Sequence, residues 1–357
     1  MKILYVCNFN LDNYSGRNRA TKQKLKALKK QIDELYIISS KLKKFKFLEL
    51  FFIELKSIYM ILKYKPNIFI SRGFVGYFSQ KLCKIMNIKT VREIHADILG
   101  ELNQLNKHWL VKFFLIPLSI YTQKIDALSD IRIFNHPYLL DWFKSNFFDS
   151  SNDIYVYNGY DIKSRSLLTK EEVIKKYNLD KEIKYLVFVG EASYWHGIDY
   201  LVCLQESLNK LTKNIKIICA GGKVSKEDDP EKLLINITPL NDVGCAEIIQ
   251  ASEACLLPVR QSRVSPGSPL KLYDYILHKK YVITQKELKG YEDEVLRYNF
   301  GESVDFNDSE NLSFKIIEIL KNLRDKDEQI IIENFSWDER MKEWLLGIWK
   351  YENKIRD

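Results

Sequence analysis

The sequence has few glycine and proline residues, which are enriched in flexible and disordered segments. Its 357 residues include only 14 glycines and 8 prolines, which excludes long disordered or low-complexity segments. It also has no internal repeat and no run of about 18 uninterrupted apolar residues, so no membrane-spanning helix is expected. A chain of this length exceeds one ordinary hydrophobic core, and two domains are therefore expected.

The chain has no cysteine pattern typical of a disulfide framework or a zinc site. Its six cysteines lie far apart, without a CxxC pair or a cluster with histidine. Most stand in apolar runs, where a thiol packs as a small hydrophobe. The first ten residues turn polar too early for a secretory signal. Together these features indicate a reduced, cytoplasmic compartment.

Acidic residues are the minority among the charges. There are 55 Lys and Arg against 47 Asp and Glu, a net charge of +8. The excess reflects either a generally lysine-rich chain or attraction to phosphates or acidic lipids. The basic residues are scattered and form no recognisable nucleic-acid module, so no nucleic-acid partner is expected.

Short apolar runs alternate with stretches of helical periodicity along the whole chain. Strand-like runs lie at residues 2–9, 34–39, 67–71 and 90–94, and again at 185–189, 215–220, 233–237, 254–258 and 281–284. Strands separated by helices of about ten residues or more imply βαβ units and a parallel sheet. We predict an α/β protein of two such domains, with the Asn-Gly turn at 157–160 marking the break.

Ligands of open parallel sheets bind beyond the carboxyl ends of the strands. The loop at residues 10–16 follows the first strand, and Gly16 opens a helix whose free N–H groups favour an anion. A plain turn is the alternative. No GxGxxG motif is present, so the usual dinucleotide fingerprint is missing.

A second loop carries an unusual pair of side chains. Trp195 and His196 stand between Gly190 and Gly197, after an apolar strand and before a helix. His196 is able to hold a phosphate, either protonated or through a neutral N–H. The alternative is a surface loop whose tryptophan packs locally.

The third loop is the most informative, with the sequence RQSRVSPGSPLKLYDY over residues 260–275. Arg260 and Arg263 lead into a turn with exposed amides and then into a helix that carries Lys271 and Asp274. Successive N–H groups at such a start are able to cradle a diphosphate. Asp274, one turn into the helix, is placed to accept two ribose hydroxyls. The alternative is a proline-capped helix with solvated charges.

These segments resemble the retaining glycosyltransferases of the GT-B fold, specifically the large family four of bacterial polysaccharide and lipid-linked glycan synthesis. VFVGEASYWHGIDYLV resembles the family's strand, glycine loop and helix, and SPGSPLKLYDYILHKKYVI resembles its donor-binding helix. ITPLNDVGCAEIIQASEACLLPV resembles the nucleobase-side loop with the helix and strand that follow. VYNGYD and VREIHAD resemble elements of the first domain. The matches follow the family order over nearly the whole chain.

The resemblance implies two Rossmann-like parallel-sheet domains facing a central cleft. Residues 1–160 would form the acceptor domain, residues 161–335 would bind the nucleotide sugar, and residues 336–357 would form a helix that crosses back to pack on the first domain. The reaction implied is transfer of a sugar from a nucleoside diphosphate sugar, uridine in preference to guanosine, to a hydroxyl of a glycan or lipid-linked acceptor. The resemblance further implies retention, no bound metal and no separate cofactor, in the synthesis of surface polysaccharide such as lipopolysaccharide or capsule.

The resemblance also assigns residues. Asp274 takes the place of the ribose-binding glutamate, and His95 should lie near the reacting end of the sugar. The other residues expected to line the donor site are Gly16, Gly190, Glu191, His196, Gly197, Leu240, Arg260, Arg263, Gly267, Ser268, Pro269, Leu270 and Lys271.

Three departures from the family pattern stand out. Glu191 occupies a position where arginine is common, His196 one where lysine is common, and Pro266 the position of the first paired glutamate. Neutralisation of the donor phosphates is therefore expected to shift to Arg260, Arg263 or Lys271. Glu93 and Asp97 flank His95 and are candidates to orient its ring or meet the acceptor, while the acidic run at 227–229 reads as solvated surface rather than a metal site.

Two stretches favour contact with an anionic membrane surface. Residues 41–65 mix lysines with the aromatic residues Phe45, Phe47, Phe51, Phe52 and Tyr59, and residues 109–121 are a second candidate. Packing against the core is the alternative for both. By resemblance we expect peripheral binding to the inner face of the bacterial plasma membrane. A nucleotide-sugar epimerase of GT-B fold and a catalytically silent GT-B subunit remain as other functions.

Overall fold

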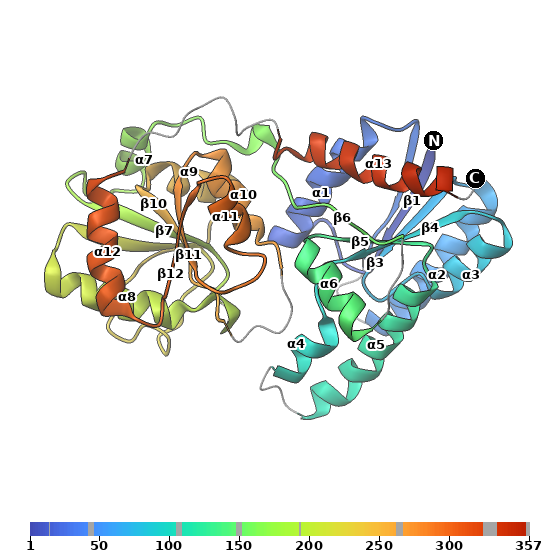
Figure 1. The fold of residues 1–357 in the computed structure, drawn as a ribbon, viewed down its shortest axis with the longest axis horizontal. Helices are drawn as coiled ribbons and strands as arrows, with labels where there is room; N and C mark the ends of the chain where they lie inside the picture. Colours follow the sequence, from blue (N-terminus) through green and yellow to red (C-terminus); the bar gives the residue numbers. More distant parts are fainter. Residues whose placement is uncertain are drawn as a thin grey trace. The chain divides into compact units, whose positions relative to one another are not determined.

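The computed structural model describes residues 1–13, 15–41, 46–104, 109–147, 152–192, 194–261, 267–323 and 334–354. The chain forms two compact units. The first unit comprises Met1–Asn158 and Trp337–Asp357, with Gly267 and Ser268 grouped with it, and the second comprises Gly159–Arg263 and Pro269–Ser336. Figure 1 shows a sheet flanked by helices in each unit.

The first unit is built on a six-stranded parallel sheet in the order β2-β1-β3-β4-β5-β6. Its strands are β1 (Lys2–Cys7), β2 (Glu34–Ile38), β3 (Ile68–Arg72), β4 (Lys89–Ile94), β5 (Ile131–Phe134) and β6 (Ile154–Tyr155). Its helices are α1 (Gly16–Lys29), α2 (Lys46–Tyr64), α3 (Tyr77–Ile85), α4 (Ile98–Gln104), α5 (Trp109–Leu128), α6 (Pro137–Asn146) and α13 (Trp337–Lys354).

Strands β1 and β3 of this sheet are apolar over most of their length because helices cover both faces. Leu4 and Val6 of β1 are buried on one face with Phe69 of β3. Ile53 and Ile61 of α2 close the same cluster. The continuous apolar runs in the sequence are therefore the buried strands of a parallel sheet.

The second unit repeats this plan with the strand order β12-β11-β10-β7-β8-β9. Its strands are β7 (Lys184–Gly190), β8 (Ile215–Gly221), β9 (Ile235–Ile237), β10 (Ala254–Leu257), β11 (Tyr281–Gln285) and β12 (Gly301–Val304). Its helices are α7 (Lys170–Lys176), α8 (Ile198–Leu211), α9 (Asp242–Ala251), α10 (Leu270–Leu277), α11 (Asp293–Arg297) and α12 (Ser309–Lys321), with short 3-10 turns η1 (Ile162–Ser164) and η2 (Tyr194–His196).

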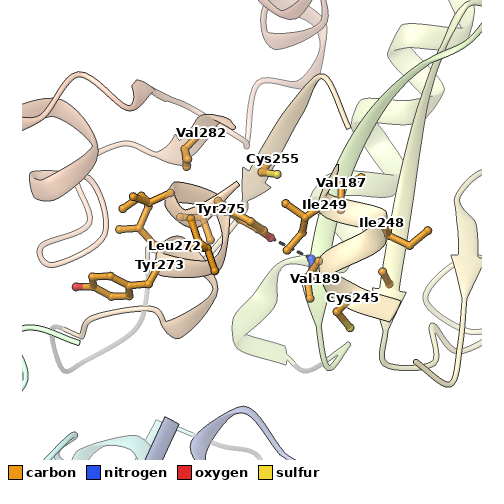
Figure 2. Close-up of a cluster of buried hydrophobic side chains, with 14 of the residues drawn as sticks. Val187, Val189, Cys245, Ile248, Ile249, Cys255, Leu272, Tyr273, Tyr275 and Val282 are labelled. Atoms are coloured by element: carbon orange, nitrogen blue, oxygen red, sulfur yellow. Dashed lines mark hydrogen bonds between the residues drawn. The ribbon is translucent and has the colours of Figure 1, made fainter. Parts of the chain in front are cut away.

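A buried tyrosine fixes α10 against this sheet. The Val189 backbone N–H donates to the Tyr275 hydroxyl over 3.0 Å, and that hydroxyl donates to the Leu256 carbonyl over 3.3 Å. Figure 2 shows the Tyr275 side chain reaching from α10 to Val189 among the buried apolar side chains. The start of α10 is thereby held close to the carboxyl end of β7.

The last helix returns to the first unit, as expected from the resemblance. In α13, Trp337 Nε1 donates to Gln23 Oε1 of α1 over 3.2 Å, and Lys30 Nζ lies 2.6 Å from Asp338 Oδ2. The prediction of two parallel-sheet α/β domains with a returning C-terminal helix is confirmed. Strands β5, β6 and β12 were not predicted.

Candidate functional site

In the second unit, the carboxyl ends of β7 and β8 are formed by glycine residues. Gly190 ends β7 with φ 132°, and its carbonyl accepts from the Gly222 N–H over 3.0 Å. A Cβ at Gly222 would lie only 2.6 Å from the Cα of Glu191. Side chains are thus excluded here, which leaves peptide groups at the edge where parallel sheets bind ligands.

Lys271, in the first turn of α10, points its amine at this backbone. A Cβ built on Gly190 would lie 3.0 Å from Lys271 Nζ, which itself lies 3.9 Å from the centre of the Phe188 ring. The nitrogen is buried and has no hydrogen-bond partner in the described part of the chain. A buried amine without an acceptor is costly, which makes this position a candidate anion site.

Burial lowers the pKa of Lys271 to about 7, against the opposing influence of Cys219, Glu191 and Asp274. The amine is therefore poised between its neutral and charged forms at physiological pH. An anion arriving beside it would favour the charged form and raise the pKa again.

Asp274 stands one turn further along α10 and is half-buried. Its backbone carbonyl accepts from His278 Nδ1 over 2.7 Å. The segment before the helix is tightly enclosed, since Gly267, Ser268 and Pro269 are buried while Leu270 is half-buried. The structure thus brings Lys271, Asp274, Gly190 and the start of α10 together.

The loop after Gly190 folds back on itself. His196 Nδ1 donates to the Glu191 carbonyl over 2.6 Å, and the imidazole lies against the Phe188 ring. Gly197 has φ 56°, and a Cβ there would lie 2.1 Å from the Pro258 carbonyl oxygen. One nitrogen of His196 is therefore used to shape the loop.

Arg260 contacts residues of the loop after Gly190 and of α8. Its NH2 lies 2.7 Å from Asp199 Oδ1, and its guanidinium carbon lies 5.2 Å from the centre of the Tyr200 ring. Its backbone N–H donates to the Trp195 carbonyl over 3.1 Å. Arg263 and Pro266 lie outside the described residues. Of the two described cations proposed for the phosphates, Lys271 is the one that lies beside Gly190.

Leu240 lies in the loop that leads from β9 to α9, half-buried against the core. The Thr238 hydroxyl donates to the Gly221 carbonyl over 2.9 Å, which ties this loop to the end of β8. Asn241 then caps α9 by accepting from the Gly244 N–H. Leu240 is thus held near the same edge of the sheet as Gly190.

The acidic run at 227–229 has structural roles. Asp228 accepts from the Ser225 hydroxyl, and Asp229 accepts from the backbone N–H groups of Leu233 and Leu234. Within the ranges described, no group of three or more His, Cys, Asp or Glu side chains is placed to hold a metal ion.

The first unit has a cavity of about 800 Å³ at the carboxyl ends of β1, β3 and β4. Phe9, which follows β1, is buried in it, and two cations lie against its ring. The guanidinium carbon of Arg17 lies 4.5 Å from the ring centre and that of Arg72 lies 5.2 Å from it. Arg72 also donates to the Thr21 hydroxyl over 2.9 Å.

Sequence reasoning did not single out these two arginines. A signal for Arg17 was present, because a cation in the first turn of a helix opposes the helix dipole and calls for another reason. Arg72 ends an apolar strand, which places a charge at the edge where ligands bind. The predicted residue Gly16 begins α1, and the cavity is lined by its neighbours Asn13, Arg17 and Asn18.

His95 lines the same cavity and is partly buried. Asn135 Nδ2 donates to its Nδ1 over 3.4 Å, so the neutral ring carries its proton on Nε2, which lies 3.4 Å from Glu93 Oε1. Burial, with the charges of Arg72, Lys24 and Arg17, holds the pKa of His95 well below its usual range. The imidazole is therefore a neutral N–H donor at pH 7.

Of the two acidic residues flanking His95, only Glu93 contacts it. Glu93 is also paired with Lys24 and accepts from the Tyr5 hydroxyl over 2.7 Å. Asp97 accepts from the Gly100 N–H and from Trp142 Nε1, so it caps α4 instead of orienting the imidazole.

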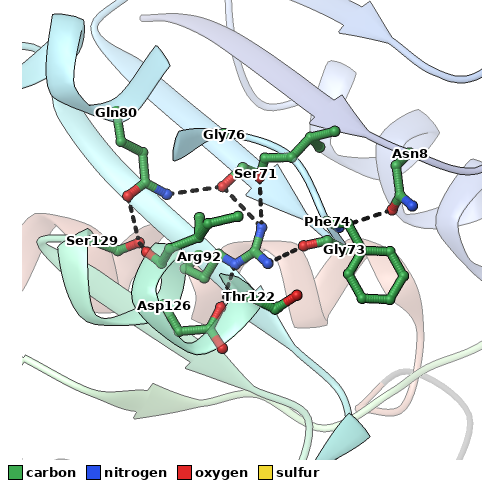
Figure 3. A network of polar contacts seen from close by, with 12 residues as sticks. Asn8, Ser71, Gly73, Phe74, Gly76, Gln80, Arg92, Thr122, Asp126 and Ser129 are labelled. Carbon is green, nitrogen blue, oxygen red and sulfur yellow. Dashed lines mark hydrogen bonds and ion pairs between the residues drawn. The ribbon is translucent and has the colours of Figure 1, made fainter. Parts of the chain in front are cut away.

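A buried arginine shapes the wall of the cavity. Arg92 Nε lies 2.6 Å from Asp126 Oδ1, and the guanidinium group donates to the Ser71 hydroxyl over 3.2 Å and to the Gly73 carbonyl (Figure 3). Asn8 Oδ1 accepts from the Phe74 N–H over 3.2 Å in the same view. The loop after β3 is thus fixed from both sides.

A family match covers much of the second unit. Residues 169–336 match the family described as "Glycosyl transferases group 1". This stretch covers most of the second unit and includes Gly190, Lys271 and Asp274. The sequence comparison with curated proteins gives no match.

Solved structures are similar to the whole chain. A glycosyltransferase from Rickettsia africae ESF-5 is 18% identical with a TM-score of 0.71, over 100% of this chain and 99% of that one. WaaG, a glycosyltransferase involved in lipopolysaccharide biosynthesis, is 13% identical with a TM-score of 0.67, over 96% and 94%. UDP-GlcNAc 2-epimerase from Methanocaldococcus jannaschii is 13% identical with a TM-score of 0.57, over 98% and 100%. The chain therefore has the GT-B fold, and residues 169–336 match the glycosyl transferases group 1 family.

Proposed function

We propose that this protein transfers a sugar from a nucleoside diphosphate sugar to a hydroxyl of a glycan or lipid-linked acceptor. The observation that carries the proposal is Lys271: its buried Nζ has no hydrogen-bond partner among the described residues and lies beside Gly190. A diphosphate placed there would supply the acceptor that the amine needs. The match of residues 169–336 to the glycosyl transferases group 1 family supports this proposal.

The residues divide the work as follows. Lys271, charged once the donor is bound, stabilises the negative charge that grows on the departing diphosphate. Asp274 accepts the ribose hydroxyls of the nucleotide, uridine in preference to guanosine. The departing phosphate takes the acceptor proton, and the sugar keeps its anomeric configuration. The cation of Lys271 and the N-terminus of α10 replace a metal ion in this scheme.

His95 has a positioning role in this proposal. Because its ring is neutral at pH 7, His95 donates a hydrogen bond through Nε2–H but brings no positive charge to the substrate. Its partner Glu93 is held by Lys24 and Tyr5, which keeps that carboxylate from acting as a mobile base. We therefore assign His95 to orientation of the sugar or acceptor.

Nucleotide-sugar epimerisation is the second candidate, favoured by one observation: a histidine and a carboxylate, His95 and Glu93, lie in contact in a cavity. Two titratable groups at such a distance resemble an acid/base pair. The engagement of Glu93 by Lys24 argues for the transferase instead. Incubation with donor alone separates the two, because only an epimerase would isomerise the sugar without an acceptor.

We also propose peripheral contact with an anionic inner-membrane surface, in surface-polysaccharide synthesis. Helix α2 exposes an apolar stripe formed by Leu48, Phe51, Phe52, Leu55, Tyr59 and Leu62. Lys56 and Lys63 are exposed on the same helix, which suits acidic headgroups. Phe45 lies outside the described residues.

On α5, Trp109 and Phe113 are exposed. Every described helix is too short or too polar to cross a bilayer.

A calorimetric titration with UDP, GDP and CMP tests the donor assignment. We expect UDP to bind the wild-type protein, and Asp274→Ala to weaken it about tenfold to a hundredfold, because hydrogen bonds to a charged group are lost. Glu318→Ala, an exposed carboxylate on α12, is the matched control and should bind as the wild type does. Failure of every nucleotide to bind would contradict the proposed function.

A further inference from the structure

Asn135 lies beside His95 because of the register between β4 and β5. The two strands run parallel, and Ile94 is paired with Phe134, the last residue of each strand. His95 and Asn135 are the next residues along the two strands, which lie about 4.8 Å apart in a sheet. The register thus brings the side chain of Asn135 to the His95 ring, where its Nδ2 lies 3.4 Å from Nδ1.

Asn135 is placed to affect a ligand through the imidazole and not by direct contact. Its side chain is only 7% exposed. It lines a second, smaller cavity of about 20 Å³, while His95 lines both this cavity and the large one. A space of that size has room for a water molecule but not for a sugar. Such a water would supply a donor for Asn135 Oδ1, which has no hydrogen-bond partner within the described ranges.

The two polar neighbours of the His95 ring make opposite demands on its nitrogens. Glu93 is paired with Lys24, which favours its ionised form, and an ionised carboxylate only accepts hydrogen bonds. Its Oε1 lies 3.4 Å from Nε2 and therefore favours a proton there. The Nδ2 of Asn135 only donates, and it therefore favours a bare Nδ1. Together the two neighbours select one neutral tautomer.

The other charges around the imidazole oppose a second proton. The charged and titratable groups near it are Lys24 and Arg17 of α1, Arg72 of β3, Glu93 of β4 and, in the lining of the smaller cavity, Tyr157. Burial, with the charges of the three cations, holds the pKa of His95 well below its usual range. Asn135 differs from these neighbours because it brings a donor to Nδ1 without a charge.

We propose that Asn135 is a positioning residue that fixes the proton of His95 on Nε2 and keeps the ring uncharged. The proposal rests on the proposed function, in which the imidazole donates to the sugar or the acceptor. The contact of 3.4 Å between Nε2 and Glu93 is longer than an ordinary N–H···O hydrogen bond. The proton on Nε2 is therefore available to a ligand oxygen without the loss of a strong hydrogen bond.

A neutral ring suits the proposed reaction. Glycosyl transfer passes through a transition state in which the sugar ring carries positive charge. An imidazolium close to it would raise the free energy of that state, whereas a neutral N–H donor would not. The protonation set by Asn135 should therefore affect the transfer step and leave nucleotide binding, which depends on the second unit, unchanged.

Asn135→Asp replaces the donor with a carboxylate of nearly the same shape. Carboxylates then face both nitrogens of His95, so the ring should hold two protons at pH 7 and titrate at a higher pH than in the wild type. Nitrogen NMR spectra of histidine-labelled protein report the proton on each ring nitrogen, and His95→Gln identifies the signals of this residue. In the wild type we expect a bare Nδ1 and a protonated Nε2 from pH 6 to pH 8.

Asn135→Ala repeats the test without a buried charge. It removes the donor and admits water to the ring, and both changes favour the protonated form. His95 should therefore titrate at a higher pH than in the wild type, by a smaller shift than in Asn135→Asp. An unchanged titration in Asn135→Ala would overturn the proposal even if Asn135→Asp did not fold.

Asn67→Asp is the matched control, because it adds the same charge to the first unit at the opposite edge of the sheet. Asn67 is exposed, lies just before β3, and accepts from the Lys2 N–H through Oδ1, as an aspartate oxygen would. His95 should titrate in this control as in the wild type. Equal shifts in Asn67→Asp and Asn135→Asp would mean a general charge effect and overturn the proposal. A protonated Nδ1 in the wild type would also overturn it.

UDP binding is measured on the same proteins and separates this inference from the proposed function. Asn135→Asp should bind UDP as the wild type does. If UDP binds and the protonation of His95 is the same in every variant, the positioning role fails while the proposed function stands. If the protonation changes as expected and UDP does not bind, the proposed function fails, and Asn135 fixes the proton of His95 without an assigned part in transfer.

Discussion

The two units share one architecture and handle positive charge in opposite ways. Each has a six-stranded parallel sheet with its candidate ligand groups at the carboxyl edge. In the second unit the cation is Lys271, whose pKa burial lowers to about 7. In the first unit the cations are Arg17 and Arg72, which lie against Phe9. Lysine loses its proton when it is buried, whereas the guanidinium of arginine stays charged in proteins.

The positive charge of the second unit's site therefore depends on pH and on its surroundings, whereas that of the first unit's arginines is fixed. On the proposed function, the charge on Lys271 forms when the diphosphate of the donor binds, so the affinity for the donor should depend on pH near neutrality. The charge of the arginine pair should not change in the same range of pH, because guanidinium groups stay protonated in proteins. A donor that is to be released as a nucleoside diphosphate suits the first arrangement.

The largest expected effect falls on the fixed charge of the first unit. Arg92→Leu leaves Asp126 as an unpaired buried carboxylate, so the variant should lose about 3–5 kcal/mol of unfolding free energy. Asp126→Leu added to it should restore part of that stability. Urea unfolding measures both. If Arg92→Leu costs less than about 1 kcal/mol, the pair is not the fixed element that we describe.

The next effect concerns Lys271. Lys271→Met should weaken UDP binding about tenfold to a hundredfold through loss of a charged hydrogen-bond donor. Lys213→Met, an exposed lysine of the same unit, should bind UDP as the wild type does. Calorimetric titration at pH 7 makes the comparison, and equal affinities in the two variants would remove Lys271 from the site.

The same substitution has a stability signature with a defined sign. Because the folded-state pKa of Lys271 is lowered to about 7 from its ordinary value of 10.5, the folded protein binds fewer protons than the unfolded chain between these values. The wild type is therefore destabilised relative to Lys271→Met below pH 7, and the difference shrinks as the pH rises toward 10.5. Thermal unfolding at pH 6 and pH 9 checks this. A pH-independent difference would contradict the lowered pKa.

The smallest expected effect lies at the arginine pair. Phe9→Leu keeps an apolar side chain beneath Arg17 and Arg72 but removes the aromatic ring, so the free energy of unfolding should fall by about 0.5–1 kcal/mol through loss of the cation–π contacts. Urea unfolding of the variant and the wild type measures this difference. An unchanged free energy of unfolding would mean that the ring does not stabilise the two guanidinium groups.

The sequence predicted the second unit better than the first because its site is local. Gly190 ends one apolar strand, and Lys271 and Asp274 share one helix, so their spacing is visible in the chain. The fold-back of His196 onto the Glu191 carbonyl was not predictable, since it depends on the φ of Gly197 and the approach of Pro258.

The arginine pair of the first unit depends on strand pairing. Parallel pairing of β1 with β3 places Arg72 opposite Cys7, two residues before Phe9, and α1 then brings Arg17 to the same ring. No spacing in the sequence encodes that meeting. Two-residue strands such as β6 were likewise missed, because they have too few residues to show a period.

Proton uptake on UDP binding is the most direct test of the central claim that Lys271 becomes charged against a diphosphate. Calorimetry at pH 8 in buffers of different ionisation enthalpy measures it. The account predicts uptake approaching one proton in the wild type and none in Lys271→Met. Binding of UDP without proton uptake, or equal uptake in both proteins, would contradict it.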